Sequence, residues 1–155
     1  MLFRHFRAEY TDDVIDLVPL HFNGMNRDSG FGHEQVWRIT LHNERQEIGQ
    51  ISFRDGESRI IYYFGHIGYH IDPPFRGNHY AYRACKLLER EIRLSGKTSV
   101  VITCDPDNDP SRKTCEKLGC YFERCAEVPE DIHERFEISR MKSRYIWLIG
   151  SDRER

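Results

Sequence analysis

The alternation of hydrophobic and polar positions predicts strands in the first half of the chain and alternating helices and strands in the second. Residues 36–54 form two runs of β-branched and aromatic residues around a polar turn at 43–46, which predicts a β-hairpin. Residues 59–71 are largely apolar and aromatic. We therefore expect one long strand or two strands joined at Gly65, since a glycine in a strand marks a bulge or a close backbone approach. Residues 99–104 are a continuous apolar run, which is typical of a buried, parallel strand.

Helical periodicity is clear on both sides of that apolar run. Across residues 79–95, four apolar positions recur at spacings that place them on one helix face: Ala81, Cys85, Leu88 and Ile92. Gly96 follows as a natural stop. A second helix is expected to begin after an N-cap at Asp109, with Pro110 in its first turn, and to run to about Leu118.

The two ends of the chain give weaker patterns. Residues 12–22 fit a short helix or a strand, and residues 23–33, rich in Gly and Asn, predict a loop. Residues 120–128 and 143–150 predict two final strands, separated by the polar stretch 129–142. An apolar strand between two helices, with antiparallel strands elsewhere, predicts an α/β (α+β) layered fold.

Composition narrows the class of protein. The chain has 155 residues, 39% hydrophobic and 31% charged, which fits one globular domain spanning residues 1–155. A formal net charge of -2 gives no electrostatic reason to expect nucleic acid or a membrane as partner. The five cysteines form no CxxC pair, and the charged start MLFRHFRAEY does not resemble a secretion signal. We expect free thiols, no metal site and a cytoplasmic location.

The turn RGNHYA, from Arg76 to Ala81, joins a strand end to a helix start. The first helical turn offers unpaired backbone N–H groups, Gly77 allows a positive φ or a close approach, and Arg76 adds a bidentate charge. These features suit an anion such as a phosphate. The turn matches neither the Walker loop nor the dinucleotide fingerprint, so an ordinary strand-to-helix turn remains an equal alternative on these residues alone.

A second segment, NDPSRKTCEKLG at residues 108–119, follows the buried strand. Together the two segments resemble the GNAT superfamily of acyl-CoA-dependent N-acyltransferases. Its members carry a pyrophosphate loop Q/R-x-x-G-x-G/A after their fourth strand, which Arg76 to Ala81 match. After their fifth strand they carry an Asn-led segment ending in Glu-Lys-Leu-Gly, which Asn108, Ser111 and residues 116–119 match. The resemblance covers residues 65–122.

The resemblance implies a fold and an activity. The implied GNAT fold is a central mixed, mostly antiparallel twisted sheet with flanking helices, splayed between its fourth and fifth strands. The implied activity is transfer of an acetyl group from acetyl-CoA, as co-substrate, to a primary amine of a small molecule or peptide by direct attack. The alternative is a non-catalytic acyl-CoA-binding sensor. The expected partners are acetyl-CoA and an unidentified amine acceptor, and a homodimer through the final strands is an option.

The resemblance also assigns cofactor-binding roles. The pyrophosphate would lie on a run of backbone N–H groups beside Arg76: those of Gly77, Asn78, His79, Tyr80 and Ala81. The pantetheine arm would follow the strand end near Ile71, whose neighbouring N–H would polarise the thioester carbonyl. Asn108 would bind the pantetheine or order the second helix, with Ser111 close by. His79 stands where glycine is usual. It either replaces that glycine, with negative φ and its ring turned away, or itself holds a phosphate.

The catalytic roles have more than one candidate residue. His66 stands where some relatives carry a glutamate, so it is one candidate base, and His70 on the same strand face is the second. A histidine paired on a strand face is the competing interpretation of His66. Cys115 occupies the position of the usual tyrosine acid and is either that acid or an inert buried thiol. We favour loss of a dedicated acid, with water or another side chain supplying the proton.

Overall fold

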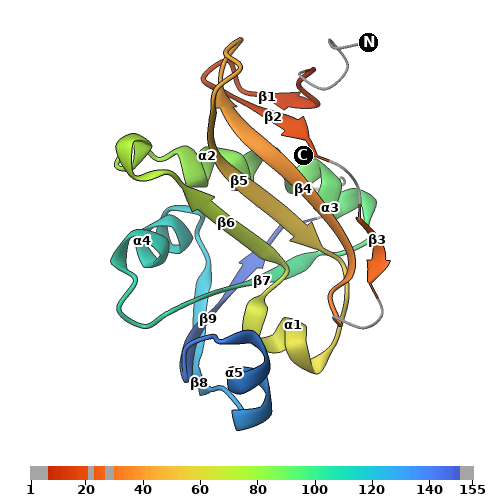
Figure 1. Cartoon of the computed structure of the whole chain (residues 1–155), viewed down its shortest axis with the longest axis vertical. Helices are drawn as coiled ribbons and strands as arrows, with labels where there is room; N and C mark the ends of the chain where they lie inside the picture. The colour runs from red at the N-terminus through yellow and green to blue at the C-terminus, as the bar shows by residue number, and fades with distance from the viewer. Residues whose placement is uncertain (1–6, 21–22, 27–29, 151–155) are drawn as a thin grey trace.

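A single twisted sheet organises the protein (Figure 1). The computed structural model describes residues 7–20, 23–26 and 30–150. The strands in these ranges are β1 (Tyr10–Thr11), β2 (Ile15–Pro19), β3 (Asn23–Asn26), β4 (Gly32–Leu41), β5 (Glu47–Arg54), β6 (Ile67–Ile71), β7 (Ser99–Cys104), β8 (Tyr121–Glu127) and β9 (Met141–Leu148). The strand order is β1-β2-β4-β5-β6-β7-β9-β8, and β3 pairs with β4 beside this path.

The sheet is antiparallel except at its centre, where β6 and β7 run parallel. Within the described ranges these two strands pair at one position, Ile67 with Ile102, and then diverge toward their carboxyl ends (Figure 1). The mixed, mostly antiparallel sheet and its splay are therefore confirmed. The parallel strand predicted over residues 99–104 is confirmed only on the β6 side, at Ile102, because all six residues pair antiparallel with β9 on the other side.

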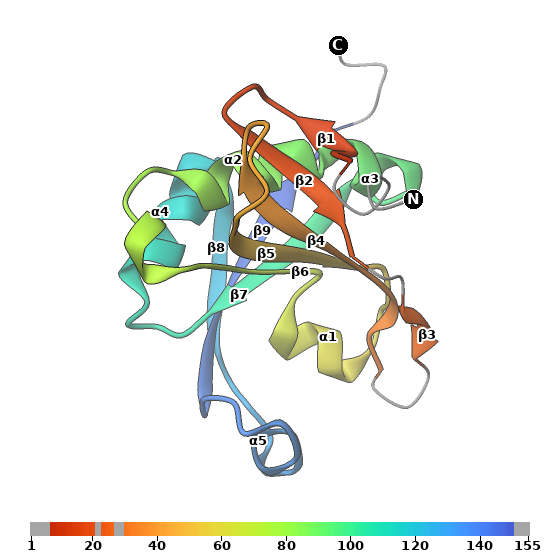
Figure 2. The ribbon, with the colours of Figure 1, turned by 45° about the horizontal axis from the view of Figure 1, so that its top comes forward.

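Helices cover the two faces of the sheet unequally (Figure 2). One face carries α2 (Tyr80–Leu87) and α3 (Glu89–Leu94), and α4 (Asp109–Lys117) packs beside α2. The other face carries α1 (Arg59–Phe64), against which α5 (Glu130–Phe136) packs through the rings of Phe64 and Phe136, 5.0 Å apart. Much of this second face, over β4, β5 and β6, is left to line a cleft.

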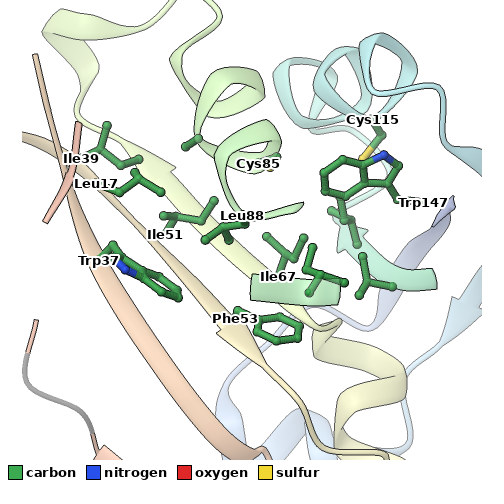
Figure 3. Close-up of a cluster of buried hydrophobic side chains, with 14 of the residues drawn as sticks. Leu17, Trp37, Ile39, Ile51, Phe53, Ile67, Cys85, Leu88, Cys115 and Trp147 are labelled. Carbon is green, nitrogen blue, oxygen red and sulfur yellow. The ribbon is translucent and has the colours of Figure 1, made fainter. Parts of the chain in front are cut away.

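The hydrophobic core lies between the sheet and the α2–α3 layer (Figure 3). Leu88 and Ile92 are fully buried against the strands, and each contributes roughly 1.5–3 kcal/mol by leaving water. Ala81 and Cys85 are buried as well, so the single helix face predicted from periodicity is confirmed. The core also includes sheet residues that face these helices: Leu17, Trp37, Ile39, Ile51, Ile67 and Trp147.

The strand predicted over residues 59–71 is wrong in its first half, which is the helix α1. Two local caps explain the difference. The Ser58 side chain accepts a hydrogen bond from the Ile61 N–H, and Gly65, at φ 79°, donates its N–H to the Ile61 carbonyl. Thr103 of β7 then donates its hydroxyl to the Tyr63 carbonyl, which anchors the helix end. These contacts outweigh the strand preference of the aromatic run.

Other segments differ in detail from the prediction. The helix expected over residues 79–95 is divided at Leu88 into α2 and α3. The loop expected over 23–33 contains β3 and the start of β4, with residues 27–29 outside the described ranges. The polar stretch 129–142 contains α5. The ambiguous segment 12–22 contains the strand β2, and residues 21 and 22 lie outside the described ranges.

The N-cap of α4 is Asn108, not Asp109 as expected. The Asn108 side chain accepts a hydrogen bond from the Ser111 N–H at 3.2 Å, so Asp109 is the first helical residue. Both residue types make good caps, and the tertiary path of the chain after β7 decides between them.

Gly65 provides a test of the geometry at the base of the splay. Its backbone lies at φ 79° and ψ 168°, and a Cβ there would lie 2.8 Å from the Val101 carbonyl oxygen. We expect Gly65→Ala to lower the free energy of unfolding by about 3 kcal/mol, as strain and a backbone clash add. Gly96, at φ 88° with nothing within 4 Å, is the matched control, and Gly96→Ala should cost about 1 kcal/mol. Urea denaturation measures both, and equal losses would contradict a clash specific to β7.

Candidate active site

A cleft of about 990 Å³ opens where β6 and β7 diverge. Its walls are the carboxyl ends of the two strands, the loop that leads into α2 and the first turns of α2 and α4. Its floor extends across the uncovered sheet face, past β6 onto β5 and β4. The cleft therefore reaches both sides of β6.

The hydrogen-bond alternation of an antiparallel ladder decides which groups of β6 face the gap. The Asp72 N–H donates to the Ile48 carbonyl at 2.8 Å, and the His66 carbonyl accepts the Arg54 N–H at 2.7 Å, so these groups and, by alternation, the backbone groups of His70 face β5. The backbone N–H and C=O groups of Tyr69 and Ile71 consequently point toward the opening between β6 and β7.

The loop before α2 presents a row of backbone donors. From Gly77 to Tyr82, the backbone N–H groups have no acceptor among the residues that the structure describes. The first backbone N–H after them that has an acceptor is that of Arg83, which donates to the His79 carbonyl. Gly77 lies at φ 87° and His79 at φ 60°. Alternating left-handed residues turn successive N–H groups to one side, which makes an anion-binding concavity. The negative φ expected if His79 simply replaced a glycine is wrong, because this position is left-handed.

Two side chains stiffen this loop. Arg76 Nε donates to the Ile71 carbonyl at 2.8 Å, so the rest of its guanidinium extends from a fixed base beside the cleft. The Asn78 amide donates to the Phe75 carbonyl at 3.1 Å, and Asn78 does not line the cleft through its side chain. His79, Tyr80 and Ala81 do line it.

The opposite wall is the start of α4. Ser111, in the first turn after the Asn108 cap, lies 2.8 Å from the Tyr69 hydroxyl oxygen across the gap. Burial raises the pKa of Tyr69, so its hydroxyl keeps its proton at neutral pH. Asn108, Ser111 and Tyr69 all line the cleft, together with Lys113, a cation that the sequence did not single out.

The comparisons with known proteins agree with this arrangement. The model described as "Acetyltransferase (GNAT) domain" matches residues 4–121, which is most of the chain. The chain belongs to the GNAT acetyltransferase family. No curated protein matches the sequence.

Solved GNAT structures share the fold. The microcin C7 self-immunity acetyltransferase MccE, with acetyl-CoA and AMP, has a TM-score of 0.58 and 22% identity over 74% of this chain and 61% of its own. The Vibrio fischeri ribosomal-protein-S5-alanine acetyltransferase has a TM-score of 0.59 and 19% identity over 76% of this chain and 62% of its own. The Salmonella typhimurium acetyltransferase that modifies the N-terminal serine of L7/L12 has a TM-score of 0.57 and 22% identity over 76% of this chain and 64% of its own. This GNAT chain thus spans under two thirds of the length of each.

Three residues of this GNAT domain that the sequence singled out do not line the cleft: His66, Asn78 and Cys115. Cys115 is fully buried on α4 within the core, where Figure 3 shows it beside Trp147. Its hydrogen bond with Cys120, and then burial, raise the pKa of its thiol. This environment is that of an inert core thiol.

His66 is 4% exposed, and both of its ring nitrogens are bonded. Nδ1 accepts the Val101 N–H at 2.9 Å, which leaves the proton on Nε2, and Nε2 donates to Glu57 at 2.8 Å. The His66 backbone N–H also donates to the Val101 carbonyl at 2.8 Å. His66 therefore clamps one residue of β7 at two points, directly below the splay.

The uncovered face holds the other candidate and the residues that the sequence missed. His70 is exposed in the cleft, 3.7 Å from Asp72 Oδ1 through Nε2. Glu34 and Arg54, an ion pair at 2.8 Å, lie in the same floor. The period-two alternation Gln50, Ser52, Arg54 puts Arg54 on the His70 face once the β5–β6 register is known, but the sequence alone did not give that register.

Two features are absent from the part of the GNAT chain that the structure describes. In residues 7–20, 23–26 and 30–150, no group of three or more His, Cys, Asp or Glu is arranged to hold a metal ion. No helix in those ranges has the length and apolar character needed to cross a membrane. All five cysteines, which lie in the described part, are free.

The clamp at His66 predicts a stability effect that depends on pH. Burial lowers the pKa of His66, so between that lowered value and about 6.5 the unfolded chain binds the extra proton and stability rises with pH. Asn can accept the Val101 N–H but does not titrate. We expect His66→Asn to be less stable than wild type at pH 7.5, and the gap to narrow at pH 5.5.

His66→Leu is the companion variant, since it leaves the Val101 N–H without its acceptor and should cost about 1–3 kcal/mol more than His66→Asn. Opposing contributions, such as the pKa of His42 raised by Asp16, are common to all three proteins and cancel in the differences. Urea titrations at both pH values measure the effect. A gap that widens at low pH would contradict the assignment.

Proposed function

We propose that this chain is a single acyl-CoA N-acyltransferase domain that moves an acetyl group from acetyl-CoA to a primary amine of a small molecule or peptide by direct attack. The observation that carries the proposal is the cleft between β6 and β7. It combines a row of backbone donors at one end with an open sheet face at the other. A thioester held between them is accessible to an amine from the second face.

The loop into α2 suits the pyrophosphate of acetyl-CoA. The row of N–H groups from Gly77 to Tyr82 and the N-terminal dipole of α2 both favour negative charge. Arg76, anchored by its Nε, adds a cation at the loop start, and Lys113 adds another across the cleft. In this arrangement the left-handed backbone of His79 shapes the cradle, and its ring is secondary.

The edge of β6 suits the pantetheine arm. Its amide groups can pair with the gap-facing N–H and C=O groups of Tyr69 and with the Ile71 N–H, as an added strand would, whereas the Ile71 carbonyl already accepts a hydrogen bond from Arg76 Nε. The same edge supplies a backbone N–H to polarise the thioester carbonyl, which stabilises the oxyanion that forms when the amine attacks. Asn108 acts through α4, which it caps, rather than on the ligand.

His70 is our proposed general base. The attacking amine must lose a proton, and an imidazole suits that task near neutral pH. His70 lies in the cleft on the uncovered face, whereas both nitrogens of His66 are already bonded away from the cleft. The geometry therefore favours the second of the two sequence candidates.

The Tyr69–Ser111 pair is our proposed source of the proton for the CoA thiolate. The two hydroxyls face each other across the gap through which the pantetheine would run. Cys115, at the position of the usual tyrosine, is turned into the core, which supports loss of the dedicated acid. Transfer from a hydroxyl pair to a departing thiolate requires reprotonation from solvent, which the open cleft allows.

We propose a cytoplasmic setting, in which the five free thiols would stay reduced. β8 is an edge strand of the sheet, and its Tyr121 and Phe122 are exposed, which supports it as the contact of a homodimer. Neither assignment is needed for the chemistry in the cleft.

Binding and turnover are tested together. We expect acetyl-CoA to raise the melting temperature and AMP at equal concentration to leave it unchanged, because AMP lacks the pyrophosphate and the pantetheine. A panel of polyamines, aminoglycosides, amino acid amides and N-terminal peptides should then release free thiol from acetyl-CoA faster than hydrolysis. Binding without any turnover would instead support the acyl-CoA sensor. No binding of acetyl-CoA would contradict both the acetyltransferase and the sensor.

The choice of base is tested with the active amine from that panel. His70→Ala should lower kcat by roughly 10²-fold or more and leave the KM for acetyl-CoA within about twofold. Cys115→Ala, at the candidate acid, is the control and should keep kcat within about threefold, since the thiol lies outside the cleft. Full activity in His70→Ala would exclude it as the base.

A further inference from the structure

Arg54 is a fixed guanidinium on the floor of the cleft, at the end of β5. Its side chain is 14% exposed, which is low for an arginine that lines an open cleft. Register places Arg54 on the sheet face shared with Ser52, Gly68 and His70, the face from which the acceptor amine would approach. The inference that follows rests on the proposed acetyl transfer.

Four residues hold the guanidinium in place. Nε donates to Glu34 at 2.8 Å, and Nη1 donates to the carbonyls of Phe64 and Gly65 at 3.5 and 3.3 Å. The guanidinium carbon lies 4.8 Å from the Phe31 ring centroid and 5.9 Å from that of Phe64. A planar cation held by an ion pair, two carbonyls and two rings has little freedom left to lose when it binds a ligand.

The remaining nitrogen, Nη2, lies beside Gly68 of β6. It has no hydrogen-bond partner among the residues that the structure describes. Nη2 occupies the space that a side chain at residue 68 would need, since a Cβ built on Gly68 would lie 2.8 Å from it. The absence of a side chain at Gly68 thus leaves room for the guanidinium edge on the cleft floor, one step along the strand face from His70.

We propose that Arg54 Nη2 binds an oxygen of the acceptor. The acceptor is then an amine whose α-carbon carries a carbonyl or carboxylate group. Gly68 and His70 are two residues apart, about 6.6 Å along the strand. That span accommodates a hydrogen bond from Arg54 to the oxygen, the short bridge from oxygen to amine, and a contact from the amine to His70. An amine without such an oxygen leaves this donor unmatched.

Glu34 decides which oxygen fits better. Because this carboxylate already neutralises Arg54, a second carboxylate gains little net attraction, whereas a neutral amide oxygen accepts the hydrogen bond without added charge. The amide carbonyl of an amino acid amide or of an N-terminal peptide residue is therefore the expected partner. A free amino acid presents the same kind of oxygen as a carboxylate, and the experiment separates the two.

The test compares L-alaninamide, L-alanine and sec-butylamine, which has a similar shape and no oxygen, as acceptors with acetyl-CoA. In Arg54→Lys, which keeps the charge beside Glu34 but loses the second fork nitrogen, kcat/KM for alaninamide should fall by about tenfold or more. For sec-butylamine it should change by less than about twofold, and the KM for acetyl-CoA should stay the same. Comparing each amine with itself removes the differences in amine basicity.

Gly68→Ala provides the second variant. Its methyl group meets the flexible end of Arg54 and so displaces Nη2 without removing any charge. We expect the same selective loss for alaninamide. If kcat/KM falls for alanine instead of alaninamide, the oxygen that Arg54 binds is that of a carboxylate, and the proposed role of Arg54 is supported.

Equal losses for alaninamide and sec-butylamine, or no loss in either folded variant, would overturn the inference while leaving acetyl transfer intact. No turnover of any of the three amines by wild type would overturn it too, since the proposed class includes small molecules. In that case the thermal shift and the wider amine panel decide separately whether the proposed function survives.

Discussion

The single parallel contact between β6 and β7, at Ile67 and Ile102, is the constraint on which the site depends. Below it the strands are locked, since the backbone and ring of His66 both bind Val101, and Gly65 brings its backbone against the same residue. Above it the strands separate and the backbone groups of Tyr69 and Ile71 face an opening. A polar edge exposed inside a cleft must be satisfied by water or by a ligand, so the break in the sheet is the feature on which the proposed acetyl-CoA site rests.

β6 separates two tasks by the alternation of its side chains. Tyr69 and Ile71 belong to the face that meets α2 and α4. The loop before α2, with its row of backbone N–H groups, and the Ser111 hydroxyl lie on this face. Gly68 and His70 belong to the uncovered face, beside Arg54. In the proposed reaction, the thioester would lie along the open edge of β6 and the amine on its uncovered face, while the other edge stays paired with β5.

Much of this organisation was predictable from local sequence. The two segments around Gly77 and Asn108 identified the family, which residues 4–121 confirm, and the apolar run Ser99–Cys104 located the central parallel strand. The helix α1 was missed because its aromatic residues suit a strand and only its caps, Ser58 and Gly65, distinguish it. A short capped helix carries a weak periodic signal. Its anchors are distant in sequence: Thr103 of β7, and Arg144 of β9, whose guanidinium carbon lies 3.5 Å from the Tyr62 ring centroid.

The sequence by itself determined the fold class and located the proposed acetyl-CoA side of the cleft, because a loop and a helix start can offer consecutive backbone N–H groups to a phosphate. Only the tertiary structure showed which residues line the side proposed for the acceptor. His66 and His70 are equivalent in the strand pattern, yet one is bonded to Val101 and Glu57 and the other opens into the cleft. Arg54 meets Gly68 through strand register and is stacked on Phe31 and Phe64 from two other segments. Such contacts join residues far apart in the chain, and no local pattern encodes them.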